Sequence, residues 1–238
     1  VIVVALLSTL VFTRWLGARL VVRRSLAALI AAGTSICGAS AVVAANTVVR
    51  GDDEDVAYAI ACVTVFGSLS MFGLPLLAGP LQLDPHAFGL WAGASIHEIA
   101  QVVAAAFQNG QAAGEYGTIA KLSRVMLMAP LVLAMAWLAR RAAHRAGATV
   151  HAAEVPVPWF VFGFIALVVL GSLAPLPEAL LRTASTVTTI MLTMALAAMG
   201  LGTDLRKLRA QGVRPLLLGA AAWLFIAGVS LAGVKLAT

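Results

Sequence analysis

Apolar residues fill long stretches of this chain, and polar residues collect in short segments between them. A helix needs about 17–25 apolar residues to cross a bilayer. Only helices and closed barrels satisfy the whole backbone in lipid, so runs near this length predict an all-α polytopic bundle. We count eight such runs, and we expect interrupted helices among them: 1–17, 26–45, 56–78, 88–107, 117–140, 159–175, 183–202 and 215–235.

The composition supports a membrane protein. Of the 238 residues, 61% are hydrophobic and 11% are charged, whereas a soluble domain is about 45–50% apolar and about 25% charged. No polar stretch is long enough for a separate soluble domain, so residues 1–238 are predicted to form one membrane domain. The chain begins with Val1 and has no basic segment before its first apolar run. We therefore expect an internal start, with further residues upstream, and not a signal peptide.

Charge differs from loop to loop. If all eight runs cross, loops 18–25, 79–87, 139–158 and 203–214 share one side, and together with Arg14 they hold 11 of the 16 Lys and Arg residues. The acidic residues at 52–55 and Glu115 then lie on the other side. Cytoplasmic loops are enriched in Lys and Arg, so we place the basic loops in the cytoplasm. No basic segment is interleaved with aromatic residues, so the net charge of +6 does not indicate nucleic acid.

A short internal repeat relates two of the runs. Residues 32–45 (AGTSICGASAVVAA) and 92–105 (AGASIHEIAQVVAA) are identical at 8 of 14 positions, at an offset of 60. This predicts repeat units at 26–78 and 88–140. Transporters are often built from repeats that meet near the midplane. If two crossings separate the copies, both have the same orientation in the membrane and the repeat is parallel. A broken or re-entrant run would change that relative orientation. The sequence leaves both possibilities open.

The first copy is rich in glycine and hydroxyl residues. Two glycines within eight residues make a poor continuous helix, and N–H groups at the N-terminus of a half-helix bind anions. Close helix packing through small residues is the alternative. The candidate substrate-binding residues of this segment are Thr34, Ser35, Cys37, Gly38 and Ser40.

The second copy adds ionisable side chains. Gly93 and Ser95 join the candidate substrate-binding residues, and His97, Glu98 and Gln101 follow them at helical spacing. Ionisable groups inside a span are functional candidates by default, and Gln101 shares the helix surface of His97 and Glu98, so we predict that these three residues couple or gate transport. A structural polar clamp between helices is the alternative. One His and one Glu supply too few ligands for a metal site.

Two basic residues lie inside the next run. Lys121 and Arg124 are the fifth and eighth residues of it and share a helix face. They could neutralise Glu98 or hold an anionic substrate, and Arg124 is a further candidate substrate-binding residue. Snorkelling to the membrane interface is the alternative.

Six segments, in order along most of the chain, carry a resemblance to a known family: TSICGASAVVAA (34–45), EDVAYAIA (54–61), FGLWAGASIHEIAQVVAAAF (88–107), KLSRVMLMAP (121–130), PWFVFGF (158–164) and MALAAMGLGTDLRKLRAQGVRPLLLG (194–219). They resemble the YeiH family (UPF0324) of bacterial inner-membrane proteins, whose members are often labelled sulfate exporters. Members are similar to the cation/proton antiporter and anion transporter group, which implies a transporter fold with interrupted helices. The family normally has further N-terminal membrane helices, which implies that this chain is truncated.

The leading prediction is a secondary transporter of a small anion, such as sulfate or a sulfonate, across the inner membrane. Coupling protons or sodium would accompany the anion, and the bilayer is the other partner. A cation-coupled carrier of an organic solute and a non-transporting membrane assembly subunit are the alternatives, and a homo-oligomer stays open. The sequence has no nucleophile or phosphate-binding motif. We therefore predict no enzyme, no cofactor, no metal and no nucleic-acid partner.

Overall fold

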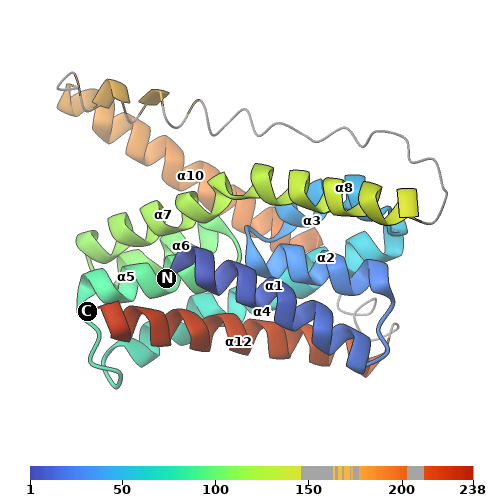
Figure 1. The fold of residues 1–238 in the computed structure, drawn as a ribbon. Helices are drawn as coiled ribbons and strands as arrows, with labels where there is room; N and C mark the ends of the chain where they lie inside the picture. The colour runs from blue at the N-terminus through green and yellow to red at the C-terminus, as the bar shows by residue number, and fades with distance from the viewer. Residues whose placement is uncertain are drawn as a thin grey trace.

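The computed structural model describes residues 1–145, 177–202 and 212–237, with isolated positions between 163 and 173, and helices are the regular secondary structure of these residues. The two chain ends lie at the same end of the molecule, and α7 and α8 follow one another along it (Figure 1). The elements are α1 (Ile2–Arg19), α2 (Arg24–Ser35), α3 (Ala39–Val49), α4 (Asp53–Ala78), α5 (Pro85–Ser95), α6 (Ile99–Ala106), the 3₁₀ turn η1 (Phe107–Asn109), α7 (Gln111–Met126), α8 (Met128–Arg145), α10 (Glu178–Gly202) and α12 (Val213–Ala237).

Five helices among the described residues are long and apolar enough to cross a membrane, which confirms the all-α membrane bundle. They are α1, α4, α10, α12 and the stretch Gln111–Leu138, which α7 and most of α8 form together. The 26 residues of α4 extend about 39 Å at 1.5 Å per residue. Apart from isolated positions, the predicted run at 159–175 lies outside the described residues.

The predicted span at 26–45 is instead a re-entrant hairpin. Residues 36–38 divide it into α2 and α3, of 12 and 11 residues, and each half extends only about 18 Å. The chain then returns to the side where α2 begins. Arg23 pairs with Asp55 at 2.5 Å and with Asp52 at 3.3 Å, and the Ser25 hydroxyl donates to Asp55 at 2.5 Å. The prediction that this run crosses is therefore wrong.

The predicted span at 88–107 is a second re-entrant hairpin, formed by α5 and α6. Near its base the rings of His86 and Tyr116 meet edge to face, with centroids 4.3 Å apart. Gly117 packs against Ala106 at the end of α6 and against the carbonyl of Gly89 near the start of α5. The start and the end of this hairpin therefore lie on one side.

Helix α4 runs from the base of the first hairpin to the base of the second. One crossing, not two, therefore separates the copies of the repeat, and the two hairpins enter from opposite sides. The repeat is inverted. At the offset of 60, α2 corresponds to α5, α3 to α6 with η1, and α4 to α7 with α8.

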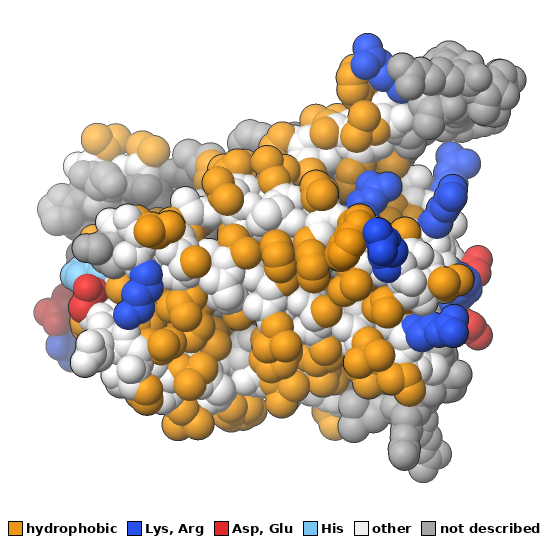
Figure 2. All heavy atoms as spheres, turned by 60° about the horizontal axis from the view of Figure 1, so that its bottom comes forward, with side chains coloured by type: hydrophobic (Ala, Val, Ile, Leu, Met, Phe, Trp, Pro, Cys, Tyr) orange, Lys and Arg blue, Asp and Glu red, His pale blue; other side chains and the backbone are white. Residues whose placement is uncertain are grey.

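In this topology two loops lie on the opposite side of the membrane from the side that the sequence predicted. Residues 50–55 lie on the side of Arg19, Arg23 and Arg24, and loop 79–84 lies on the other. Figure 2 shows hydrophobic side chains over the middle of one face and Lys and Arg gathered toward one end. By the positive-inside rule the base of the first hairpin faces the cytoplasm.

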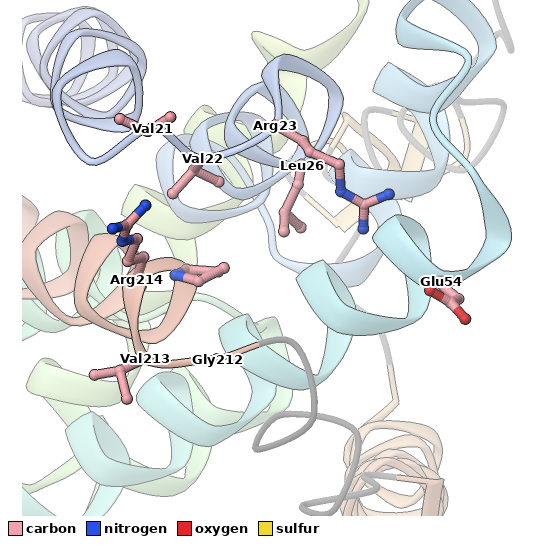
Figure 3. A pocket seen from close by; sticks show the side chains of 9 residues that line it. Val21, Val22, Arg23, Leu26, Glu54, Gly212, Val213 and Arg214 are labelled. Carbon is pink, nitrogen blue, oxygen red and sulfur yellow. The ribbon is translucent and has the colours of Figure 1, made fainter.

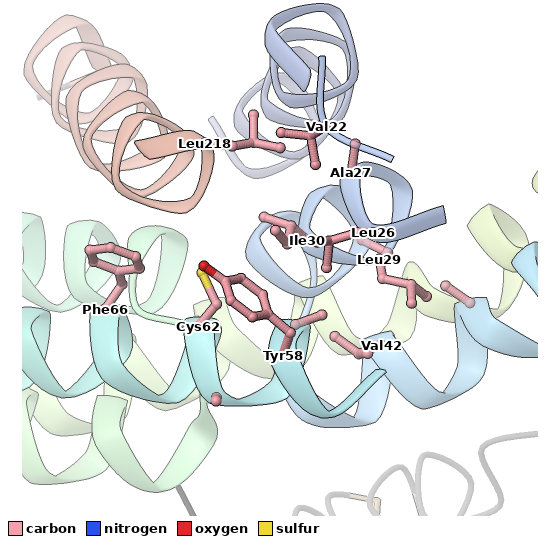
Figure 4. Close-up of a cluster of buried hydrophobic side chains, with 14 of the residues drawn as sticks. Val22, Leu26, Ala27, Leu29, Ile30, Val42, Tyr58, Cys62, Phe66 and Leu218 are labelled. Atoms are coloured by element: carbon pink, nitrogen blue, oxygen red, sulfur yellow. The ribbon is translucent and has the colours of Figure 1, made fainter. Parts of the chain in front are cut away.

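The first hairpin packs against α4 and α12. Tyr58, Cys62 and Phe66 follow each other at i,i+4 spacing along α4 and are all buried. They face Ile30 of α2 and Leu218 of α12 (Figure 4). This core fixes the hairpin against a long membrane-crossing helix and so positions its tip.

Candidate functional site

The two hairpin tips meet at a buried lysine. Lys121 of α7 is fully buried, and its Nζ donates to the carbonyl oxygens of Ile36 and Ile96, both at 2.9 Å. Ile36 follows the last residue of α2, and Ile96 follows the last residue of α5. They occupy equivalent positions in the repeat, so one ammonium group links the two tips.

Arg124 extends this contact by one turn of α7. The residue is 1% exposed, and its guanidinium donates only to main-chain carbonyls among its described contacts. A helix C-terminus leaves carbonyls without partners and carries partial negative charge, so Lys121 and Arg124 satisfy the interrupted ends of α2 and α5. Both are buried and not at the interface, unlike snorkelling side chains. The acceptors of Arg124 are Thr34 (2.9 Å), Ser35 (3.3 Å), Gly93 (3.3 Å), Ala94 (2.8 Å) and Ile96 (3.2 Å).

The other two half-helix ends converge on Glu98. Its carboxylate accepts from the backbone N–H of Ala39, the first residue of α3, at 2.5 Å. Glu98 is also the N-cap of α6, where its carboxylate accepts from the N–H of Gln101 and its own N–H donates to Gln101 Oε1 at 3.2 Å. One carboxylate therefore occupies the positive ends of two helix dipoles.

Gln101 holds this cap against α4. Its Nε2 donates to the Thr64 carbonyl and to the Ser68 hydroxyl, both at 3.2 Å. Gly67 lies directly beneath the amide, and a Cβ at that position would collide with it. Thr64, Gly67 and Ser68 belong to a helix that sequence patterns identify only as an apolar span, so the sequence analysis missed them.

Gly38 makes the approach of Glu98 to α3 possible. Its φ is +69°, in the region that favours glycine. A Cβ at Gly38 would overlap the Glu98 carboxylate. The break between α2 and α3 therefore requires glycine for its backbone conformation and for the space it leaves to the opposite tip.

The remaining candidate residues have varied surroundings. The Ser95 hydroxyl donates to the Trp91 carbonyl at 2.6 Å, and the Cys37 thiol contacts the Met128 sulfur at 3.9 Å. Thr34 is buried and Ser40 is exposed. Direct substrate contact by these side chains stays a prediction.

Two buried polar atoms in the tips lack a described partner. They are the Ser35 hydroxyl and His97 Nδ1, and both residues are at most 1% exposed. Buried polar groups without partners are uncommon in folded proteins. They mark a candidate position for a polar ligand at the tips.

The charges at the tips do not balance. Among the described residues near the tips, Lys121 and Arg124 face only one acidic side chain, Glu98. Helix C-termini surround the two cations, and helix N-termini surround the carboxylate. The part of the chain that the structure describes brings no three His, Cys, Asp or Glu side chains together as a metal would require.

A cavity of about 630 Å³ opens away from the tips, at the basic end of the molecule (Figure 3). It lies between the α1–α2 turn and the starts of α4 and α12, and none of the candidate residues lines it. We therefore do not assign the tip chemistry to it. Its lining residues are Val21, Val22, Arg23, Leu26, Glu54, Gly212, Val213, Arg214 and Pro215.

Curated proteins of several bacteria are similar to this chain. A UPF0324 membrane protein of Pseudomonas aeruginosa is 46% identical over 235 residues, which cover 93% of this chain and 65% of that protein. A UPF0324 membrane protein of Bordetella bronchiseptica is 41% identical, with coverage of 97% and 73%. The UPF0324 inner membrane protein YeiH of Salmonella typhi is 36% identical, with coverage of 95% and 66%.

The chain thus spans about two thirds of the length of these relatives. No solved structure matches it. A family model described as "Conserved hypothetical protein 698" matches residues 1–219. With the identities above, this match shows that the chain belongs to the YeiH (UPF0324) family of multi-pass inner-membrane proteins.

Proposed function

We propose that this chain forms the translocating core of a secondary transporter for a small anion, with sulfate and organosulfonates as the first substrates to test. The observation that carries the proposal is the meeting of two opposed re-entrant hairpins at buried charged side chains. Irregular backbone is tolerated at membrane depth only where it is buried in protein or lines a cavity. In transporters, interrupted half-helices near the midplane form the sites for substrates and coupling ions.

The surroundings of the Glu98 carboxylate are evidence for an anionic substrate. Its carboxylate bonds the free N–H groups of α3 and α6, and helix N-termini are general anion sites. In this proposal the carboxylate is an internal occupant that a substrate anion replaces. The excess positive charge of Lys121 and Arg124 favours a second anion at the tips.

Proton coupling follows if the substrate anion replaces the Glu98 carboxylate at these N–H groups. A proton that binds a Glu98 carboxyl oxygen neutralises the group and weakens its bonds to the N–H of Ala39 and Gln101, because charged acceptors form the stronger hydrogen bonds. The substrate anion then takes these donors. Anion and proton are bound in the same state, so they move in the same direction, and the gradients decide whether the result is uptake or export.

The opposed entry of the hairpins suits alternating access. Each tip closes the path from one side, and Lys121 joins the two through equivalent carbonyls. Movement of one hairpin relative to α7 would open the tips to one side only. His97 lies in the second tip, and in this proposal it gates access there.

Sodium coupling has less support. Unwound carbonyls at half-helix C-termini are the usual ligands for sodium in such folds. Here the carbonyls that end α2 and α5 already accept from Lys121 and Arg124. A non-transporting assembly subunit would need none of these buried charges.

The test is flux in proteoliposomes. Radiolabelled sulfate or a sulfonate is followed with and without a pH gradient, in wild type, Glu98→Gln and the control Glu115→Gln, whose carboxylate is exposed in α7. We expect saturable flux that acid accelerates on the substrate side in wild type and control. In Glu98→Gln the pH dependence should disappear. Flux without pH dependence in wild type would reject proton coupling, and absence of flux for every anion tested would reject the proposal.

A further inference from the structure

Two adjoining cavities lie at the basic end of the molecule, between α1, α2, α3 and α8. Their volumes are about 450 Å³ and about 280 Å³, and Arg14, Arg24 and Ala28 line both. They contain none of the tip residues. Because they share these lining residues, we treat the two cavities together as one recess beside the base of the first hairpin.

The recess has a basic part and an apolar part. Arg14, Arg24 and Ser25 supply the polar groups. Among the described residues neither Arg14 nor Arg24 has a hydrogen-bond or ion-pair partner. The apolar part is formed by Ala28, Val48, Val49, Met135 and Leu138.

Asp55, which is bonded to the lining residue Ser25, is already paired with another basic side chain. The Asp55 carboxylate accepts from the Ser25 hydroxyl and pairs with Arg23 at 2.5 Å. Because Arg23 offsets the charge of this carboxylate, Asp55 repels an anion in the recess only weakly and attracts Arg24 only weakly. Arg14 and Arg24 retain their charge for an external ligand.

Two tryptophans place the recess at the membrane interface. Trp15 and Trp137 are exposed and adjoin the lining residues Arg14 and Leu138 in the sequence. Arg19 lies over the Trp15 ring at 5.2 Å, and Arg141 lies over the Trp137 ring at 3.8 Å. Tryptophan is enriched at the level of lipid headgroups, so the two free guanidinium groups lie at that level on the cytoplasmic side.

We propose that this recess binds an anionic phospholipid. Its phosphate lies between Arg14 and Arg24, because guanidinium groups bind phosphate oxygens through paired hydrogen bonds. An acyl chain follows the apolar residues of α3 and α8. Basic pockets between membrane helices on the cytoplasmic side are known sites for acidic headgroups. The lipid joins α8 to the base of the first hairpin, so it stabilises that hairpin independently of any transported anion.

Native mass spectrometry of the detergent-solubilised protein tests this site. The protein is mixed with phosphatidylglycerol or with phosphatidylcholine. We expect one phosphatidylglycerol molecule to remain bound at collision energies that remove phosphatidylcholine. Arg14→Gln with Arg24→Gln should reduce this retention at least tenfold. The control Arg19→Gln with Arg140→Gln removes the same charge from the same end and should leave it unchanged.

A charge-preserving variant keeps the test decisive. Arg14→Lys with Arg24→Lys should retain more lipid than the glutamine pair and less than wild type, because lysine binds phosphate as a point charge. Equal retention of both lipids, or equal loss in the control, would overturn the proposal. Excess inorganic phosphate should not displace the lipid. Displacement by phosphate, with no preference between lipids, would show a free-anion site and contradict the lipid assignment.

Discussion

The two inverted repeats share a backbone plan but divide the chemistry unequally. The first, from α2 to α4, has small or uncharged side chains where the second, from α5 to α8, has ionisable or amide groups. Both repeats present main-chain carbonyls to the same two cations: Ile36 and Ile96 are equivalent acceptors of Lys121, and Thr34 and Ala94 are equivalent acceptors of Arg124. The equivalent pairs at the offset of 60 are Cys37 and His97, Gly38 and Glu98, Ala41 and Gln101, Ala61 and Lys121, and Thr64 and Arg124.

The difference shows how a symmetric frame holds an asymmetric site. Long side chains of the second repeat need space, and the first repeat supplies it through Gly38 and Gly67. Charge in both repeats would bury four cations without enough partners, which is costly in lipid. One repeat therefore carries the charged groups, and the other supplies the backbone atoms and the space that they need.

The largest effect should come from Arg124→Met. This change leaves carbonyls in both tips without donors, and each unsatisfied buried polar group costs about 1–3 kcal/mol. Folded protein should fall severely in size-exclusion chromatography and thermal unfolding. Thr64→Val, at the equivalent position, should cost about 1 kcal/mol or less, as single changes without a named defect usually do. Equal effects at the two positions would contradict the asymmetry.

Gly38→Ala should have the next largest effect. A non-glycine residue in this strained backbone costs about 1–3 kcal/mol, and the added Cβ also displaces Glu98. Thermal unfolding of Gly38→Ala, Glu98→Ala and the double variant measures the coupling. The double variant should be more stable than the sum of the single losses by about 0.5–3 kcal/mol. Simple additivity would show that the two tips do not touch.

Glu98→Gln should cost about 1 kcal/mol, because the capping hydrogen bonds persist but lose the charge that favours a helix N-terminus. The matched control is Asp84→Asn, which changes an ordinary N-cap whose carboxylate accepts from Ala87 N–H at 2.9 Å. Unfolding in detergent should show similar losses for both variants. Only Glu98→Gln should alter the pH dependence of flux, and a change in both would contradict a special role for the tip carboxylate.

His97→Cys should have the smallest effect, since it gives the second tip the residue of the first. His97 Nδ1 has no described partner, so its removal leaves no hydrogen bond broken at that atom. We expect stability within about 1 kcal/mol of wild type and flux that still responds to pH. Loss of pH dependence in this variant would transfer the coupling role from Glu98 to His97.

Much of the fold could be predicted from the sequence, but not that the runs 26–45 and 88–107 turn back instead of crossing the membrane. Two half-helices of 12 and 11 residues add up to the length of one membrane span, so apolar length alone cannot separate a crossing from a hairpin. Gly38 signals the break in the sequence, but the ion pairs of Arg23 with Asp52 and Asp55, which show that the chain returns, do not follow from any sequence pattern. Only the structure brings those charges together.

The candidate site was predictable as residues but not as an arrangement. Helical spacing grouped Lys121 with Arg124, yet their acceptors are carbonyls of residues 25–90 positions away. Any residue type supplies a carbonyl, so no pattern identifies them. Glu98 and Gln101 were predictable as a polar pair, whereas Ser68 and Gly67 were not, because small residues in an apolar helix carry no distinct signal.

The topology of the hairpins can be measured directly by thiol labelling in oriented membrane vesicles. Single cysteines replace the exposed residues Arg19, Asp53 and Gln111, after Cys37 and Cys62 have been removed, and a membrane-impermeant reagent is applied to each side. Opposed re-entrant hairpins predict that Arg19→Cys and Asp53→Cys react from the same side and that Gln111→Cys reacts from the other. Reaction of Asp53→Cys and Gln111→Cys from one side, opposite to Arg19→Cys, would restore the crossing runs and contradict the inverted repeat.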